Sequence, residues 1–203
     1  MQDLAANPDR ARWNERYASG SYTGSFAVRP LAEMALALPL PDGPVLELAS
    51  GPSGNALLFA DRGRHVTAVD VSDIALDLLG AEARRRGVAD LITVVHADLV
   101  SWQPPSGKEY ALVLCTGYFD RAVFAMAARA VAAGGLVGWE AFTLAARRDR
   151  PRLPAEWCLG PGEPANLLPA GFDVMSQDDL GSEPAARRRV LARHRPAWPP
   201  CTP

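Results

Sequence analysis

The sequence predicts an α/β protein whose central sheet is mostly parallel and doubly wound. Strand-like apolar runs alternate with helix-like segments between residues 45 and 143, which is typical of a parallel sheet with helices on both faces. Two more strand-like runs, residues 172–180 and 186–194, are joined across a Gly-Ser-Glu-Pro signal and predict an antiparallel hairpin. We therefore expect a seven-stranded sheet whose last two strands form this hairpin.

Turn and cap signals divide the chain into its expected elements. Aromatic and basic residues at helical spacing predict a first helix over residues 9–19. A second, amphipathic helix is expected over residues 26–38, with Ser25 as its N-cap and Pro30 in an early turn. The strands expected before the hairpin cover residues 45–49, 65–70, 91–97, 110–116 and 136–143. The helices expected between them cover residues 53–62, 72–86 and 120–133.

The last third of the chain is expected to be less regular. Two glycines at 134–135 predict a turn before the fifth strand. Residues 144–157 are rich in Arg and Pro and predict an irregular insertion, and residues 161–168 predict one short helix. We expect a single domain over residues 1–203, divided into a helical N-terminal cover (1–42), a doubly wound core (43–195) and a flexible tail (196–203).

The composition is that of an ordinary globular protein. The 203 residues are 48% hydrophobic and 22% charged, and the net charge of -2 does not suggest a nucleic-acid-binding protein. The apolar runs are too short to span a bilayer, and residues 1–17 lack the apolar segment of a secretory signal. The three cysteines are too widely spaced for a metal-binding pair or a disulfide framework. We expect a cytoplasmic monomer or homodimer without a metal, a nucleic-acid partner or a membrane partner.

The stretch from Val45 to Ser72 predicts a nucleotide site. It is expected to fold as strand, glycine-bearing turn, helix and second strand, and Gly51 and Gly54 would let a ligand approach the main chain. Asp70, at the end of the second strand, can accept both hydroxyls of a ribose, although it could instead cap the helix that follows. Glu47 adds a second anion beside the turn, which disfavours a pyrophosphate and favours an ammonium group or an ordered water.

The same stretch resembles motif I of the class I S-adenosylmethionine-dependent methyltransferases. Residues 47–55, ELASGPSGN, match its usual form of D/E-x-G-x-G-x-G, except that Ala49 replaces the first glycine. Alanine is tolerated there if that residue keeps a negative φ. The resemblance makes Asp70 the ribose-binding acid. Residues 96–99, His-Ala-Asp-Leu, resemble the segment in which Asp98 would meet the adenine amino group, although Asp98 could equally lie in a surface loop.

Further segments resemble one branch, the tellurite-resistance and thiopurine methyltransferase-like group. The matching segments are WNERY at 13–17, Asn55-Ala56, GRHVTAVDVS at 63–72, WEAFT at 139–143 and RPRLPAEWCLGPGE at 150–163. The resemblance implies a Rossmann-like fold, S-adenosylmethionine as cofactor with S-adenosylhomocysteine as product, and a small-molecule methyl acceptor.

The resemblance also implies which residues contact the cofactor. An N-terminal flap would supply Trp13, Arg16 and Tyr17, although aromatic residues at helical spacing also pack against a core. The other expected cofactor residues are Glu47, Ala49, Ser50, Gly51, Gly54, Asn55, Asp70, Val71, Asp98, Leu99 and Cys115.

The expected acceptor pocket contains Tyr118, Arg121 and Glu140, which follow the fourth strand or lie in the fifth. Tyr118 and Arg121 could instead pack on the following helix, and Glu140 could be a base, an orienting group or an ion-pair partner. Cys115 is expected to form a wall of the site, because the loop lacks the Pro-Cys of cytosine-C5 enzymes and the Asn/Asp-Pro-Pro-Tyr/Phe of amino-methylating enzymes. His96 is expected to be a satisfied strand residue.

No dedicated catalytic base stands out, which favours a soft or ionised acceptor such as a thiol or a chalcogen oxyanion. The arginines at 147, 148, 150 and 152 could attract such an anion or simply form a solvated loop. The alternatives are an O- or N-methyltransferase acting on a small natural product and a non-catalytic S-adenosylmethionine-binding module. A nicotinamide oxidoreductase is disfavoured by Glu47 and by the terminal hairpin.

Overall fold

The computed structural model describes residues 4–19, 26–181 and 186–196 and contains one seven-stranded sheet. Its strand order is β3-β2-β1-β4-β5-β7-β6. The strands are β1 Val45–Leu48, β2 Val66–Asp70, β3 Ile92–His96, β4 Tyr110–Thr116, β5 Val131–Phe142, β6 Phe172–Leu180 and β7 Arg187–His194. β1 to β5 are parallel, whereas β7 is antiparallel to both β5 and β6. The predicted fold, a mostly parallel sheet ending in an antiparallel hairpin, is confirmed.

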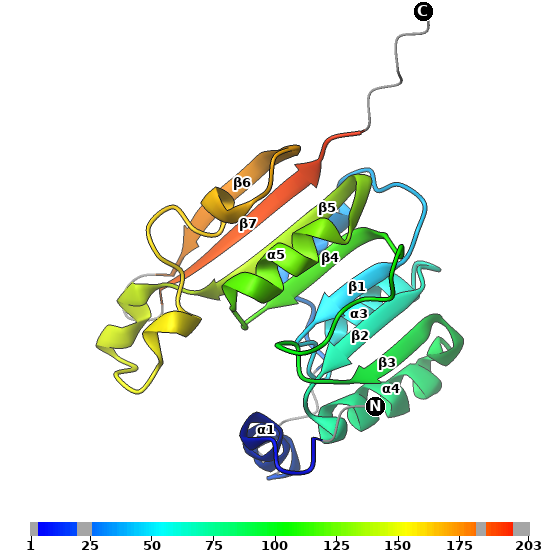
Figure 1. Cartoon of the computed structure of the whole chain (residues 1–203). Helices are drawn as coiled ribbons and strands as arrows, with labels where there is room; N and C mark the ends of the chain where they lie inside the picture. The colour runs from blue at the N-terminus through cyan, green and yellow to red at the C-terminus, as the bar shows by residue number, and fades with distance from the viewer. Residues whose placement is uncertain (1–3, 20–25, 182–185, 197–203) are drawn as a thin grey trace, which may run out of the picture.

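Helices cover both faces of the sheet (Figure 1). One hydrophobic cluster joins the sheet to α2 Pro30–Leu36, α3 Gly54–Ala60 and α4 Asp73–Arg86. A second cluster, on the opposite face, joins it to α5 Arg121–Arg129, where Phe124 meets Trp139 edge to face at 5.1 Å between ring centroids. The remaining helix, α1 Pro8–Ala18, packs on neither face and lies below the sheet in Figure 1, next to α4.

The second helix is shorter than the sequence predicts. α2 begins at Pro30 rather than at residue 26, because proline suits the first helical position, where its missing N–H is not needed. The backbone before it is held elsewhere, since the Arg29 N–H donates to Asn55 Oδ1 at 2.8 Å. The expected cap, Ser25, lies outside the described residues.

The fourth helix confirms its predicted start and stop. Ser72 is the N-cap of α4, and its Oγ accepts a hydrogen bond from the Ala75 N–H at 3.1 Å. Gly87 ends the helix in the left-handed conformation, with φ of +73°.

The fifth strand begins earlier than the sequence predicts. β5 starts at Val131 and includes the two glycines that were expected to form a turn. Gly134 has φ of +78°, and the pairing with β4 shifts between Tyr110–Val131 and Leu112–Leu136. The glycines therefore form an irregularity inside the strand. Positive-φ glycines occur both in tight turns and in strand bulges, so a glycine pair alone does not distinguish the two.

Two fully described connections run without an α-helix. Residues 97–109 link β3 to β4 as a loop, and three short 3-10 turns lie between β5 and β6. These turns are η2 Leu144–Arg148, η3 Ala155–Trp157 and η4 Ala165–Leu167, whereas η1 Ala89–Leu91 precedes β3. The irregular insertion expected over residues 144–157 is confirmed, and the short helix expected over 161–168 is reduced to η4. Most of the hairpin turn (182–185) and the tail from 197 onward lie outside the described residues.

Candidate cofactor and acceptor site

The carboxyl ends of β1 and β4 mark the switch point of the sheet. β1 pairs with β2 on one side and with β4 on the other, so the chain connections leave in opposite directions, which is where ligands bind in such sheets. Register places Leu48 beside Cys115 and Asp70 beside His96. The residues predicted to contact a ligand after β1, β2, β3 and β4 therefore share one edge of the sheet.

Asp70 ties two neighbouring turns together. Its Oδ2 accepts a hydrogen bond from the Gly51 N–H and its Oδ1 accepts one from the Ser72 N–H, both at 2.8 Å. The side chain is buried, and burial raises the pKa of its carboxyl above the ordinary value. Asp70 thus fixes the glycine turn after β1 relative to the start of α4, and each oxygen keeps a further lone pair for a ligand hydroxyl.

Glu47 is buried beneath the same turn and has neutral partners. Its Oε2 accepts a hydrogen bond from Ser53 Oγ at 2.6 Å, and its Oε1 accepts one from Asn55 Nδ2 at 2.8 Å. Burial raises the pKa of its carboxyl to about 7. A positively charged ligand group placed nearby would offset this desolvation and favour the ionised carboxylate.

Ser50 supplies a test of whether the turn fits a polar ligand. Within the described residues its Oγ is buried and has no hydrogen-bond partner. A buried hydroxyl left unpaired costs about 1–3 kcal/mol, so a ligand group that pairs with it would be favoured. The orphaned hydroxyl, next to buried Glu47 and Asp70, fits a ligand with hydroxyl and ammonium groups.

Ala49 corrects an expectation about the backbone. A negative φ is expected from the sequence at this position, whereas Ala49 has a φ of +48°. This left-handed conformation costs an alanine about 1–2 kcal/mol, and glycine adopts it freely. The turn is therefore strained at the position where the resembling motif carries glycine.

The two glycines of the turn have different neighbours. Gly51 has φ of +58°, and a Cβ on it would lie 2.9 Å from the Tyr17 hydroxyl. A Cβ on Gly54 would collide with the backbone of Phe26 and Ala27. Gly54 thus gives room to the protein's own N-terminal segment, whereas Gly51 gives room to the side chain of Tyr17 that covers the turn.

Helix α1 is docked beside this turn by contacts that the sequence motifs do not indicate. Arg10 binds Asp73 through two hydrogen bonds of 2.9 and 2.8 Å, and Asn14 Nδ2 donates to Asp73 Oδ1 at 2.7 Å. Ser72 Oγ donates to Asn14 Oδ1 at 2.6 Å, although it also caps α4. Asn7, Arg10 and Asn14 are spaced by three and four residues, so a search for one polar helix face would have found them.

Asp98 lies under the first turn of the same helix. Its Oδ2 accepts a hydrogen bond from Asn7 Nδ2 at 2.9 Å, and its Oδ1 accepts one from the Val100 N–H at 3.0 Å. The predicted neighbour Leu99 is buried, and His96 Nε2 donates to the carbonyl oxygen of Val71 at 3.0 Å. The contact between His96 and Val71 agrees with the expectation of a satisfied strand histidine.

The three predicted flap residues stack on one another. The Trp13 and Tyr17 rings are stacked with centroids 5.9 Å apart, and the Arg16 guanidinium lies 5.4 Å from the Trp13 ring centroid. Trp13 and Tyr17 are partly buried, and Tyr17 reaches Gly51. They pack together and cover the glycine turn at the same time, so their direct contact with the cofactor stays a prediction.

The predicted acceptor residues have structural partners. Arg121 donates two hydrogen bonds to Glu163, at 3.0 and 2.6 Å, and Glu140 forms an ion pair with Arg187 at 3.0 Å. Cys115 is fully buried, and burial raises the pKa of its thiol, as it does the pKa of the Tyr118 hydroxyl. Both groups hold their protons at neutral pH, so neither is a thiolate or phenolate nucleophile there.

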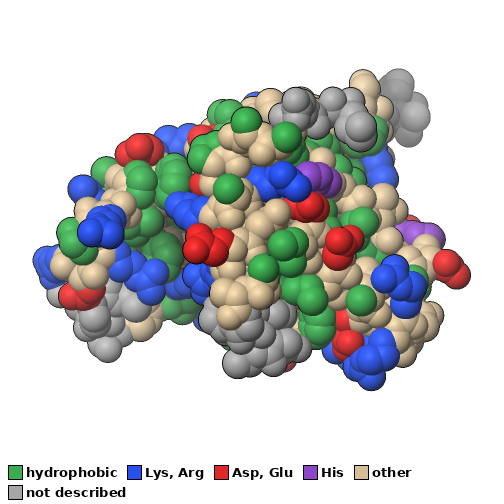
Figure 2. All heavy atoms as spheres, turned by 90° about the horizontal axis from the view of Figure 1, so that it is seen from below, with side chains coloured by type: hydrophobic (Ala, Val, Ile, Leu, Met, Phe, Trp, Pro, Cys, Tyr) green, Lys and Arg blue, Asp and Glu red, His purple; other side chains and the backbone are tan. Residues whose placement is uncertain are grey.

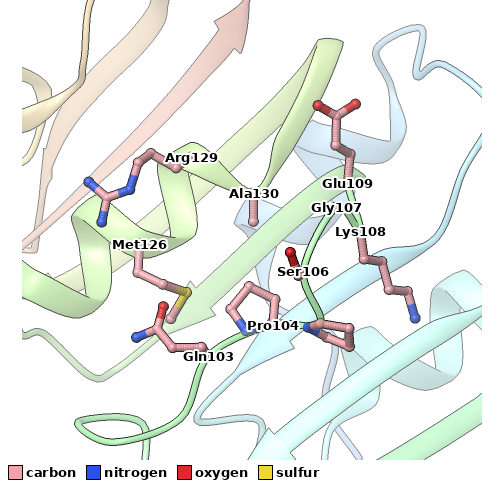
Figure 3. A pocket seen from close by; sticks show the side chains of 10 residues that line it. Gln103, Pro104, Ser106, Gly107, Lys108, Glu109, Met126, Arg129 and Ala130 are labelled. Atoms are coloured by element: carbon pink, nitrogen blue, oxygen red, sulfur yellow. The ribbon is translucent and has the colours of Figure 1, made fainter.

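A separate hollow lies at the opposite edge of the sheet. It is lined by residues 103–109, which precede β4, and by Met126, Arg129 and Ala130 at the end of α5 (Figure 3). None of the predicted cofactor or acceptor residues is among these. No helix of the described residues is long and apolar enough to cross a membrane, and the same residues contain no group of three metal-ligating side chains.

Comparison with known proteins agrees with this geometry. Residues 45–135 match the family model described as a methyltransferase domain. The match covers 91 of the 203 residues. We assign the protein as an S-adenosylmethionine-dependent methyltransferase, whose cofactor carries the ribose hydroxyls and the ammonium that the site fits. No curated protein sequence matches the chain.

Solved structures share the fold of this methyltransferase. Magnesium protoporphyrin IX methyltransferase from Synechocystis, with bound S-adenosylhomocysteine, has a TM-score of 0.68 at 14% identity, covering 92% of this chain and 98% of that one. A structure concerned with conversion of a disulfide bond into a thioacetal group in echinomycin biosynthesis has a TM-score of 0.66 at 17% identity, covering 92% and 93%. The CcbJ methyltransferase from Streptomyces caelestis has a TM-score of 0.62 at 16% identity, covering 83% and 91%. Identities this low show a shared fold alone.

We predict that Glu47→Gln flattens the pH dependence of stability. The folded-state pKa of about 7 exceeds the ordinary 4.5, so the folded wild type loses stability as pH rises from 4.5 to 7, by about 3 kcal/mol. Glutamine stays neutral and can pair with both Ser53 and Asn55. Urea unfolding without cofactor at pH 5, 6, 7 and 8 measures the free energy of unfolding of the wild type and of Glu47→Gln.

In the same series, the exposed Glu33→Gln is the control and should keep the wild-type profile. Parallel profiles for wild type and Glu47→Gln would show that burial does not perturb Glu47. At pH 8 Glu47→Gln should also bind S-adenosylhomocysteine more weakly, because the carboxylate expected to face the ligand ammonium is gone.

We predict that Ala49→Gly stabilises the protein by up to about 1.6 kcal/mol. Relief of the left-handed strain raises the free energy of unfolding by about 1–2 kcal/mol. The greater conformational freedom of glycine in the unfolded chain lowers it by about 0.4–1 kcal/mol. Chemical unfolding at pH 5 measures the change. Ala81→Gly, at an exposed position inside α4, is the matched control and should lose about 1 kcal/mol. Equal losses in both variants would contradict the strain at Ala49.

Proposed function

We propose that this methyltransferase methylates a small-molecule acceptor that is already ionised, such as a thiolate or a chalcogen oxyanion. The observation that carries the proposal is the basic surface at the end of β5. The guanidinium carbons of Arg150 and Arg187 lie 4.6 and 4.4 Å from the ring centroid of Phe142. Glu140 pairs with Arg187, whereas Arg150 forms no ion pair within the described residues. The cluster therefore keeps an excess of positive charge.

The space-filling view supports the same distribution of charge. Figure 2 views the molecule from below, the side on which α1 lies in Figure 1, and basic side chains gather around hydrophobic ones on its left-hand part. An anion that approaches this surface would be attracted over roughly a Debye length, about 8–10 Å at physiological salt. Such a surface favours acceptors that carry a negative charge.

Three groups near the predicted acceptor pocket point the same way. The raised pKa values of Cys115 and Tyr118 leave both groups protonated at neutral pH, and His96 is engaged with a backbone carbonyl. An acceptor that arrives ionised brings its own lone pair, so no side chain has to remove a proton from it.

The residues of the site would act by position rather than by acid–base chemistry. When bound, S-adenosylmethionine supplies a methyl group on a sulfonium, which is already activated for transfer. Glu47 and Asp70 would hold the cationic amino-acid end and the ribose, and the α1 cover would exclude water. Alignment of two reactants in this way supplies about 7–11 kcal/mol in favourable cases.

We also propose that the protein belongs to one particular branch of small-molecule methyltransferases. The segments at 13–17, 63–72, 139–143 and 150–163 resemble the tellurite-resistance and thiopurine methyltransferase-like group. A second candidate is N-methylation of a natural product, because the structural relatives include a glycopeptide N-methyltransferase, MtfA, with 21% identity and a TM-score of 0.57. An amine acceptor would need a proton acceptor, which makes this candidate the weaker one.

The proposed function predicts transfer of labelled methyl groups to ionised acceptors. We expect radiolabelled S-adenosylmethionine to methylate aromatic or aliphatic thiols or selenite and tellurite, with thiol rates that rise as the thiol ionises. Phenols and amines, assayed in parallel, should react slowly at neutral pH. Activity confined to phenols or amines would contradict the proposal. Binding of S-adenosylhomocysteine without transfer to any acceptor would indicate a non-catalytic module.

The basic surface gives a second prediction. Arg150→Gln should raise the KM for an anionic acceptor about tenfold, which corresponds to the loss of about 1.4 kcal/mol of attraction. It should leave kcat nearly unchanged, because Arg150 would attract the acceptor without touching the reacting atoms. Arg152→Gln removes the same charge from an exposed position of the same insertion and is the matched control. Equal effects of both variants would show that Arg150 contributes only through net charge.

A further inference from the structure

Helix α1 and the insertion after β5 meet through one arginine. The guanidinium carbon of Arg12, on α1, lies 5.4 Å from the Trp13 ring centroid and 5.1 Å from the Trp157 ring centroid. Both distances lie within the range of a cation–π contact. Trp157 ends η3 in the insertion, so Arg12 connects the N-terminal helix to a segment about 145 residues further along the chain.

Each side of this contact is anchored to the body of the protein. On the helix side, Arg12 pairs with Asp9 at 2.9 Å, and Arg10 pairs with Asp73 of α4. On the insertion side, Arg121 binds Glu163 and also donates to the carbonyl oxygen of Glu156 at 3.4 Å. The Arg12–Trp157 contact therefore bridges two separately fixed parts.

The contact lies near two residues of the predicted acceptor pocket, Tyr118 and Arg121. Arg121 donates to the carbonyl oxygens of Glu156 and Cys158, which flank Trp157. Tyr118, which follows β4, is partly buried, and the charges of Asp9 and Asp98 both act on its hydroxyl. Asp9 is the residue that pairs with Arg12. Tyr118 thus lies within electrostatic range of the first turn of α1.

The contact is weaker than the docking of α1. Cation–π pairs at partly exposed positions are weak, and the side chain of Arg12 is 52% exposed and Trp157 is 37% exposed. α1, in contrast, is held on α4 by the Arg10–Asp73 pair and by hydrogen bonds of Asn14. If α1 and the insertion separate, the contact at Trp157 will break before α1 leaves α4.

We propose that Arg12 and Trp157 form a gate over the acceptor pocket, which opens to admit the acceptor while α1 stays docked beside the cofactor turn. This inference rests on the proposed function, because it treats the pocket at Tyr118 as the acceptor site. The gate limits the acceptor to a compact molecule, since a macromolecule could not reach the strand ends beneath two joined covers. Arg12 and Trp157 are thereby specificity-determining residues rather than catalytic ones.

The gate makes a prediction that does not depend on turnover. Hydrogen–deuterium exchange would be measured on the S-adenosylhomocysteine complexes of wild type, Arg12→Gln and Trp157→Ala. In both variants the amides of residues 144–159 should exchange faster than in the wild type. The exchange rates of residues 8–18 should stay unchanged. Leu144→Ala, which shortens another exposed apolar side chain of the insertion, is the control and should behave as wild type in the remainder of the insertion. Unchanged exchange of the insertion in both variants would overturn the gate.

The gate also predicts a change in selectivity. For a series of acceptors of increasing size, Arg12→Gln and Trp157→Ala should each raise the ratio of kcat/KM for the bulkiest acceptor to that for the smallest, by about tenfold. The double variant should add little to either single change, because both remove one contact. Affinity for S-adenosylhomocysteine should stay within about twofold of wild type.

The two measurements separate failure of the gate from failure of the proposed function. Faster exchange of the insertion without methylation of any acceptor would support the gate and contradict the proposed function. Methylation of ionised acceptors with unchanged exchange and unchanged size selectivity would contradict the gate and leave the proposed function in place. Loss of α1 protection in Arg12→Gln would contradict the proposed independence of the helix.

Discussion

The two hydrogen bonds of the Asp70 carboxylate organise the whole ligand-binding edge. They join the Gly51 N–H, in the turn after β1, to the Ser72 N–H, at the start of α4. Because these turns follow adjacent parallel strands, one buried carboxylate sets the distance between them. The strained Ala49 backbone is held in this frame, as the turn must return its N–H groups toward β2.

The N-terminal cover depends on the same frame. α1 docks on Ser72 and Asp73, which immediately follow the Asp70 loop, and its Tyr17 hydroxyl lies against Gly51. Asn55 extends the arrangement, since its side chain donates to Glu47 and accepts from the Arg29 N–H. The cover is therefore built onto the turn that would hold the cofactor, so that water exclusion and cofactor binding share residues.

The sequence predicted those features whose causes are local. The glycine turn, Asp70 at a strand end and the Ser72 and Gly87 caps of α4 each follow from a few neighbouring residues. Arg121 and Glu140 show the limit, because their partners Glu163 and Arg187 lie 42 and 47 residues away and carry no pairing signal. The late start of α2 has the same origin, since Asn55 holds the Arg29 backbone from outside the helix. The φ of Ala49 could not be derived either, because the closure of the turn by Asp70 imposes it.

We infer that two buried carboxylates, Glu47 and Asp70, make this edge a site for a cationic amino-acid nucleoside rather than a pyrophosphate-bearing dinucleotide. Isothermal titration calorimetry of the purified protein with S-adenosylhomocysteine and, separately, with NAD tests it most directly. We expect saturable one-to-one binding of S-adenosylhomocysteine and no binding of NAD. Binding of NAD without binding of S-adenosylhomocysteine would contradict it.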